Sequence, residues 1–246
     1  MDNEIILKMQ NIYKTFPGVV ALENINFELR RGEVHILLGE NGAGKSTLVK
    51  ILSGAYQKTS GHIFFENQEI DIKNPKHAQE LGIAIIYQEL NLVSHLSAAE
   101  NILLGREPLL APGIINRKKL YQSTQKIIDS LQVKISSRSL VKELGVAEQQ
   151  MVEVAKALSL DAKILIMDEP TSALTEKEIE ELFKTINRLK KNGTSIIYIS
   201  HRLEELFEIG DRVTVLRDGK YVGTHKIQQT SKNELIRMMV DRDLTE

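Results

Sequence analysis

Residues 39–47 read GENGAGKST, and their types and spacing suit the binding of nucleotide phosphates. Gly39, Gly44, Lys45 and Ser46 occupy the fixed places of the pattern G-x-x-x-x-G-K-[ST]. Glycines let backbone N–H groups turn toward phosphate oxygens, and a helix after the loop adds its positive end. We expect Lys45 to reach the β- and γ-phosphates and the Ser46 hydroxyl to bind Mg²⁺. The other loop residues predicted to line the nucleotide are Glu40, Asn41, Gly42, Ala43 and Thr47.

A second candidate site lies at residues 163–170, KILIMDEP. The apolar run 164–167 predicts a buried strand that delivers Asp168 and Glu169 at its carboxyl end. Asp168 would hold Mg²⁺, usually through water, and Glu169 would orient or deprotonate the water that attacks the nucleotide. On its own the pattern is weak, because strand ends often carry solvated acidic residues. Together with the phosphate loop it predicts a nucleotide hydrolase.

Short apolar segments predict the sheet that must position these residues. Three segments alternate or carry β-branched and aromatic residues: 4–10, 25–30 and 62–66. Five nearly continuous apolar runs are typical of strands buried on both faces: 33–38, 83–87, 163–168, 195–200 and 213–217.

Amphipathic segments between these strands predict helices. The helices are expected at 46–52, at 148–158, after a capping box at Thr175 and after another at Ser231. Alternating buried strands and helices indicate an α/β fold with a mainly parallel sheet, and the early alternating strands add a small antiparallel layer. Residues 92–160 lack good strand candidates, so we expect a helical insertion there.

The composition bounds the class of protein. The 246 residues suit one large domain, or one core carrying a smaller subdomain. The net charge of −1 gives no bulk basic field for nucleic acid. The chain has no cysteine, which excludes disulfides and thiolate metal sites. No apolar run is long enough to span a membrane, and the acidic start is unlike a signal peptide.

The chain resembles the ATP-binding subunits of ABC transporters from about residue 5 to its end. The motifs GENGAGKST, YQE, ELGVAEQQMVEVAKAL, DEPTSALT and ISHRLEE occur in that family's order and spacing. The similarity is close to the ATPases of bacterial monosaccharide importers of the ribose and galactose kind, in which two such domains are usually fused. This chain looks like the first half. The resemblance implies a P-loop NTPase fold: one domain over 1–246, with a nucleotide-binding core at 1–90 and 161–246 and a helical subdomain at 91–160.

The resemblance also implies roles for single residues. Phe16 matches the aromatic residue that stacks on adenine, and Tyr13 is the nearby alternative. Gln88 matches the residue that senses the metal and the attacking water. His201 matches the histidine that contacts the γ-phosphate and steadies Glu169. The expected catalytic residues are Lys45, Gln88, Glu169 and His201, and the expected metal ligands are Ser46, Gln88 and Asp168.

The family's signature, LSGGQ, caps the γ-phosphate of the nucleotide held by the opposite domain, and the residues aligned with it here are Leu144, Gly145, Val146, Ala147 and Glu148. Gly145 lacks the serine hydroxyl, Ala147 adds a methyl group, and Glu148 adds negative charge near a tri-anion. A helix N-terminus with free N–H groups is retained. We expect asymmetry, in which this domain's own site is competent and its partner's nucleotide turns over slowly. The alternative is that the backbone N–H groups suffice.

We therefore expect an ATPase that uses ATP and Mg²⁺ at the cytoplasmic face of the cell membrane. It would pair with a second, homologous ATPase domain, fused C-terminally in the full protein, and would power monosaccharide uptake through transmembrane permease subunits. A separate binding protein would recognise the sugar, and no nucleic acid would be bound. The rivals are an ABC ATPase for amino-acid or lipid transport, and a soluble ABC ATPase acting on DNA or ribosomes. A P-loop kinase or GTP switch lacks support, because no N-K-x-D motif occurs.

Overall fold

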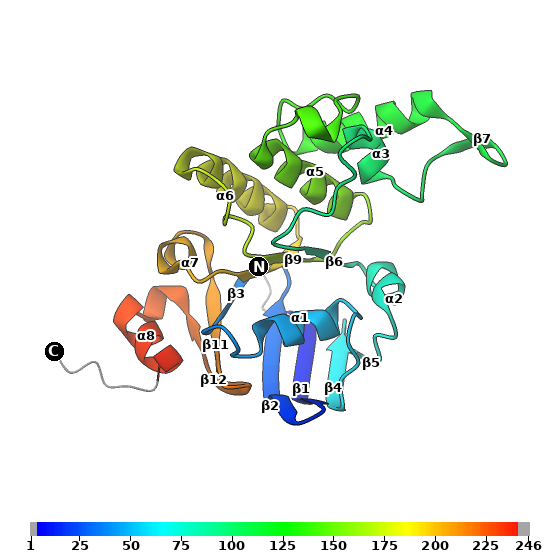
Figure 1. Ribbon diagram of the computed structural model, residues 1–246. Coiled ribbons are helices and arrows are strands. Elements are labelled where there is room, and N and C mark those ends of the chain that lie inside the picture. Colours follow the sequence, from blue (N-terminus) through cyan, green and yellow to red (C-terminus); the bar gives the residue numbers. More distant parts are fainter. Residues whose placement is uncertain (1–3, 241–246) are drawn as a thin grey trace. The chain divides into compact units, whose positions relative to one another are not determined.

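The computed structural model describes residues 4–240, and the chain forms two compact units. The first unit contains the residues up to Ile85, residues 163–169 and the residues from Ile186 onward. The second contains Ile86–Ala162 and Pro170–Thr185. The boundaries predicted from the sequence, at residues 90 and 160, stay a prediction. Figure 1 labels most of the elements of both units.

A ten-stranded sheet forms the first unit, in the order β5–β4–β1–β2–β12–β11–β3–β10–β9–β6. Its strands are β1 Ile5–Phe16, β2 Val19–Arg30, β3 Val34–Leu38, β4 Ser60–Phe65, β5 Gln68–Ile70, β6 Ile83–Ile86, β9 Ile164–Asp168, β10 Ser195–Ile199, β11 Arg212–Arg217 and β12 Lys220–Lys226. Strands β11, β3, β10 and β9 pair in parallel, whereas β2, β1, β4 and β5 pair antiparallel. The predicted α/β fold with an antiparallel layer is therefore confirmed. Strand β12 connects the two regions, because it pairs antiparallel with β11 and in parallel with β2.

The core of this unit holds the start of helix α1 (Lys45–Leu52) in place. Its apolar side chains Leu48, Val49, Ile51 and Leu52 are buried in the same cluster as residues of β1, β2 and β4. Figure 1 shows α1 lying across these strands. All five residues of β3 are buried, as expected for a strand covered on both faces. The other helices of the unit are α2 (Pro75–Glu80), α7 (Leu203–Ile209) and α8 (Lys232–Val240), with a 3₁₀ turn at Ile227–Gln229.

The second unit is mainly helical. Helices α3 (Ala98–Ile102), α4 (Arg117–Ser130) and α5 (Val146–Leu158) contact one another, and a 3₁₀ turn at Val141–Glu143 precedes α5. A short hairpin, β7 (Leu109–Ala111) and β8 (Ile114–Ile115), lies between α3 and α4 in the sequence. Figure 1 shows this hairpin projecting away from the three helices. Helix α6 (Glu176–Lys191) begins in the second unit and ends in the first.

The predicted strands and helices are present, but the sequence analysis missed strands β5 and β12 and helices α2 and α7. The expectation that residues 92–160 contain no strand was wrong for β7 and β8. One half of the predicted capping box at Thr175 is present, because its N–H and its hydroxyl both donate to Glu178 Oε2, at 2.8 and 2.7 Å. Within residues 4–240, no helix combines the length and apolar character needed to cross a membrane.

Candidate functional site

The phosphate loop connects β3 to α1, and its geometry requires glycine at both fixed positions. Gly44 has φ +99° immediately before α1, and a Cβ there would lie 2.6 Å from Leu22 Cδ2. A Cβ at Gly39 would lie 2.4 Å from the carbonyl oxygen of Leu216. The first turn of α1 carries no acidic residue, so no carboxylate of its own competes with a phosphate for its positive end.

Lys45 is buried and its ammonium group lies under the loop. Nζ donates to the carbonyl oxygens of Gly39 at 2.6 Å and Glu40 at 3.0 Å. Burial lowers the pKa of Lys45, while the carboxylates of Glu169, Asp168 and Glu40 act in the opposite direction. Asp168 and Glu169, at the end of β9, thus act electrostatically on the lysine of the phosphate loop, which brings together the two motifs predicted from the sequence.

Asp168 is the last residue of β9, and it pairs with Ile199 of the neighbouring strand β10. Burial and the adjacent Glu169 raise the pKa of Asp168, whereas Lys45 and Lys50 lower it. A partly buried carboxylate of this kind has a strong electrostatic preference for a cation beside it.

The donor set fits Mg²⁺, which binds hard oxygen ligands and keeps several waters. Asp168 supplies a carboxylate, and Ser46 in the first turn of α1 supplies an exposed hydroxyl. Among residues 4–240 no group of three or more His, Cys, Asp or Glu could hold a metal alone. An ion held by Asp168 and Ser46 would therefore take its other ligands from water and phosphate oxygens.

Glu169 and His201 form a pair at the ends of two neighbouring parallel strands. His201 Nδ1 lies 3.2 Å from Glu169 Oε1, and the histidine side chain is 64% exposed whereas the glutamate is 20% exposed. Glu169 has a left-handed backbone, with φ +48°, and its N–H donates to the carbonyl oxygen of Ile199 at 3.0 Å. A non-glycine residue in this conformation is strained, and such strain is concentrated at functional sites. The arrangement fixes a carboxylate next to a solvent-exposed imidazole.

Phe16, the candidate for stacking on adenine, belongs to a cluster of aromatic and basic side chains. Its ring lies 5.2 Å from that of Tyr56 in an edge-to-face arrangement, and Lys14 Nζ lies 4.7 Å from the Phe16 centroid. Lys50 Nζ lies 5.2 Å from the Tyr56 ring. Tyr13, the alternative, is partly buried and pairs in the sheet with Ser60. Tyr56 was not predicted as part of this cluster, because a lone tyrosine after a helix resembles any surface aromatic residue.

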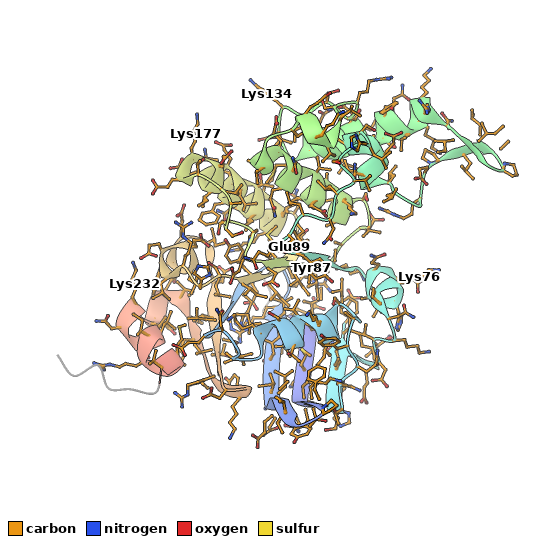
Figure 2. The ribbon with its side chains drawn as sticks, viewed as in Figure 1. Lys76, Tyr87, Glu89, Lys134, Lys177 and Lys232 are labelled. Atoms are coloured by element: carbon orange, nitrogen blue, oxygen red, sulfur yellow. The ribbon has the colours of Figure 1, made fainter. Side chains whose placement is uncertain are left out.

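Gln88 and the signature residues belong to the second unit. Gln88 is exposed, two residues after β6, between the exposed residues Tyr87 and Glu89 that Figure 2 labels. A contact of Gln88 with a metal ion or with the attacking water stays a prediction.

The signature residues form the start of α5. Gly145 is its N-cap, and Gly145 and Val146 are exposed, whereas Leu144, Ala147 and Glu148 are partly buried. Glu148 turns back on this helix end, and its Oε2 accepts the N–H of Gly145 at 2.9 Å. A carboxylate therefore already occupies a backbone donor that would otherwise be free for a phosphate. The negative charge that Glu148 adds near the phosphate was predicted from the sequence, but its contact with the Gly145 N–H was not.

Comparison with known proteins places these features in a family. The model of the ABC transporter family matches residues 22–172. The chain is 53% identical over 239 residues to a ribose import ATP-binding protein of Streptomyces avermitilis, covering 97% of this chain and 45% of that protein. It is 49% identical over 246 residues to a galactose/methyl galactoside import ATP-binding protein of Clostridium perfringens, covering 100% and 47%. A xylose import ATP-binding protein of Thermoanaerobacter pseudethanolicus is 52% identical over 246 residues, with 99% and 48% covered.

The chain therefore spans about half the length of the curated relatives it matches. Among solved structures, a nucleotide-free ATP-binding cassette from an ABC transporter superposes with a TM-score of 0.79 at 26% identity, over 90% of this chain and 91% of that chain. An ATP-binding cassette in its ADP conformation gives a TM-score of 0.80 at 25% identity, over 95% and 94%.

Proposed function

Because the chain belongs to the ABC transporter family, we propose that it binds and hydrolyses ATP and that this hydrolysis drives the uptake of a monosaccharide. The observation that carries the ATPase proposal is the coupling of Lys45 to Asp168 and Glu169, together with the 3.2 Å pair between Glu169 and His201. Ribose, galactose and xylose import proteins, each about half identical to the chain, support the substrate class.

Each part of the site has a chemical task in this proposal. Lys45 and the N–H groups of the loop bind the β- and γ-phosphates, where negative charge accumulates during transfer. Glu169 positions and deprotonates the attacking water, and His201 holds the carboxylate in place. Asp168 and Ser46 would hold Mg²⁺, which neutralises charge on the phosphates when it is bound. Phe16 stacks on adenine, and Gln88 reports the state of the site to the helical subdomain.

The chain acts in this proposal as one cassette of a larger assembly. It pairs with a second, homologous ATPase domain, fused C-terminally in the full protein, and a nucleotide lies between the two. Residues 1–90 and 161–246 form the nucleotide-binding core, and residues 91–160 form the helical subdomain. The assembly sits at the cytoplasmic face of the membrane on permease subunits. A separate binding protein delivers the sugar.

The substrate class is tested by uptake measurements in cells that produce the full-length protein. Deleting the segment that encodes this chain is expected to abolish the uptake of one labelled monosaccharide among ribose, galactose and xylose. The uptake of labelled amino acids should stay unchanged. Loss of amino-acid uptake with normal sugar uptake would contradict the proposed substrate.

The signature supports a further prediction about asymmetry between two paired cassettes. Changing Gly145→Ser together with Glu148→Gln is expected to raise hydrolysis of the nucleotide that faces this helix by roughly 10- to 100-fold. The reason is that a charge-assisted hydrogen bond to phosphate is worth roughly 1.5–3 kcal/mol. The serine fits, because a Cβ at Gly145 meets no atom nearer than Glu148 Oε2 at 3.8 Å. Single-turnover hydrolysis by the dimeric protein measures the effect.

The matched control for this prediction is Glu143→Gln, which removes an exposed negative charge at the residue directly before the signature. It should leave the rate unchanged. No gain from the double variant, once dimerisation is established, would show that the backbone N–H groups suffice and that the two sites are not asymmetric.

A further inference from the structure

Residues 104–119 form a projecting segment with an apolar tip and a basic base, which we call the apolar arm. It comprises the β7–β8 hairpin and the first turn of α4. Four large side chains at its tip are exposed: Leu109 by 56%, Leu110 by 70%, Ile114 by 58% and Ile115 by 43%. Among residues 4–240, no other segment of this length gathers as many exposed large apolar residues. Such a patch marks an interaction surface.

The hairpin is apolar on both of its faces. Leu109 pairs with Ile115, and Ala111 pairs with Ile114. Successive side chains of a strand point to opposite faces, so Leu110 points away from the face that carries Leu109. Neither face packs on protein, since all of these side chains are exposed. A partner with one flat surface would cover a single face, whereas a medium that surrounds the tip would cover both.

Basic residues gather where this hairpin meets α4. Arg117, Lys118 and Lys119 are all exposed in the first turn of α4, which has no acidic residue. The positive end of a helix disfavours cations, so their placement here costs stability. Neither Lys118 nor Lys119 has an ion-pair partner within the described part of the chain. An anionic surface would compensate these charges.

We propose that the apolar arm inserts into the interface of a membrane that contains anionic lipids. The strand rise is about 3.3 Å per residue, so the three residues of β7 span about 10 Å. That length matches the depth of about 5–10 Å to which interfacial segments bury their apolar side chains. This inference goes beyond the proposed transport function, because it depends neither on the sugar nor on ATP hydrolysis.

Vesicle binding by the full chain tests the proposal. The chain is expected to float with vesicles of phosphatidylcholine mixed with phosphatidylglycerol, but not with phosphatidylcholine alone, and high salt should release it. Lys118→Ala with Lys119→Ala should weaken binding by roughly 30-fold, since each cation near an anionic surface contributes about a factor of five. Leu110→Ser with Ile114→Ser should weaken it by at least about 10-fold.

Two matched double variants control for charge and for apolar character. Lys126→Ala with Lys134→Ala removes two exposed lysines from the same unit, and Figure 2 labels Lys134. Val19→Ser with Val20→Ser removes two exposed apolar side chains from the first unit, where they are 60% and 47% exposed. Both variants should bind anionic vesicles as the unmodified chain does. Because every altered side chain is exposed, folding should be preserved, which circular dichroism checks.

A fluorescence measurement provides a second readout. The chain has no tryptophan, so Leu110→Trp introduces one reporter at the tip. Its emission should shift to shorter wavelength with anionic vesicles, while that of Val19→Trp should not shift. The proposal is overturned if the chain fails to bind anionic vesicles, or if the arm variants bind as well as the controls. It is also overturned if the arm variants lose only their affinity for purified permease subunits in detergent, which would assign the arm to a protein partner.

Discussion

Replacing Glu169 by Gln is expected to lower the steady-state rate of ATP hydrolysis by about 10²- to 10⁴-fold, the usual contribution of a positioned general base. The affinity for ATP should change little, because the carboxylate acts on the attacking water and not on the bound phosphates. Steady-state hydrolysis and equilibrium binding of a fluorescent ATP analogue, measured on the same preparation, separate the two effects.

The geometry around Glu169 makes this substitution informative. Glutamine has nearly the same size and can keep the contact with His201 Nδ1, which now lies 3.2 Å from the carboxylate. The hydrogen bond from the Glu169 N–H to Ile199 involves only backbone atoms, so it is unaffected. What the amide cannot do is accept a proton from water. A loss of rate with normal folding would therefore report on proton transfer.

The matched control is Glu204→Gln, which removes a carboxylate from the surface of the same unit. Glu204 is 75% exposed and forms an ion pair with Lys232, which Figure 2 labels. Its removal should leave hydrolysis unchanged. A Glu169→Gln rate within a few-fold of the unmodified rate would show that another group activates the water, and His201→Ala would then be the next variant to measure.

The phosphate loop could be predicted from the sequence because its chemistry requires contiguous residues. A Cβ at Gly39 would clash with Leu216 and one at Gly44 with Leu22, both of which are distant in the sequence. The residues expected to bind phosphate themselves lie within positions 39–47, so a motif captures them without revealing which residues the two glycines pack against.

No local sequence pattern predicts the pair between Glu169 and His201. It depends on β9 and β10 being parallel neighbours in a register that pairs Asp168 with Ile199. Apolar runs predict that both strands exist, but they do not fix the order of strands in a sheet. Before the structure, only the resemblance to a family predicted that Glu169 and His201 act together.

Strand β12 and the hairpin of the apolar arm were missed for a different reason. The sequence of β12, KYVGTHK, does not alternate and contains Gly223, so its pairing with β11 is decided by tertiary contacts. The hairpin residues around Pro112 and Gly113 carry a turn signal, but strands of two or three residues have too few positions for a pattern. The Glu148 contact had a detectable signal, since Glu lies three residues after the cap.

Replacing Lys45 by Ala is expected to lower the affinity for ATP by at least about 100-fold, because two charge-assisted hydrogen bonds of roughly 1.5–3 kcal/mol each are lost. Hydrolysis should fall below detection. The affinity for ADP should fall less, since Lys45 would also reach the γ-phosphate, which ADP lacks. Titration calorimetry with both nucleotides measures this difference.

Lys45→Ala also removes the hydrogen bonds from Nζ to the carbonyl oxygens of Gly39 and Glu40. A second variant must therefore distinguish the loss of phosphate contacts from a loosening of the loop. Lys45→Met keeps the length and apolar packing of the buried side chain but removes the ammonium group, so it should lose ATP affinity to the same extent as Lys45→Ala. Lys76→Ala, at an exposed lysine on α2 that Figure 2 labels, is the matched control and should bind ATP normally. If Lys45→Met hydrolyses ATP at the unmodified rate, the ammonium group does not act on the phosphates, and the proposed ATPase site is wrong.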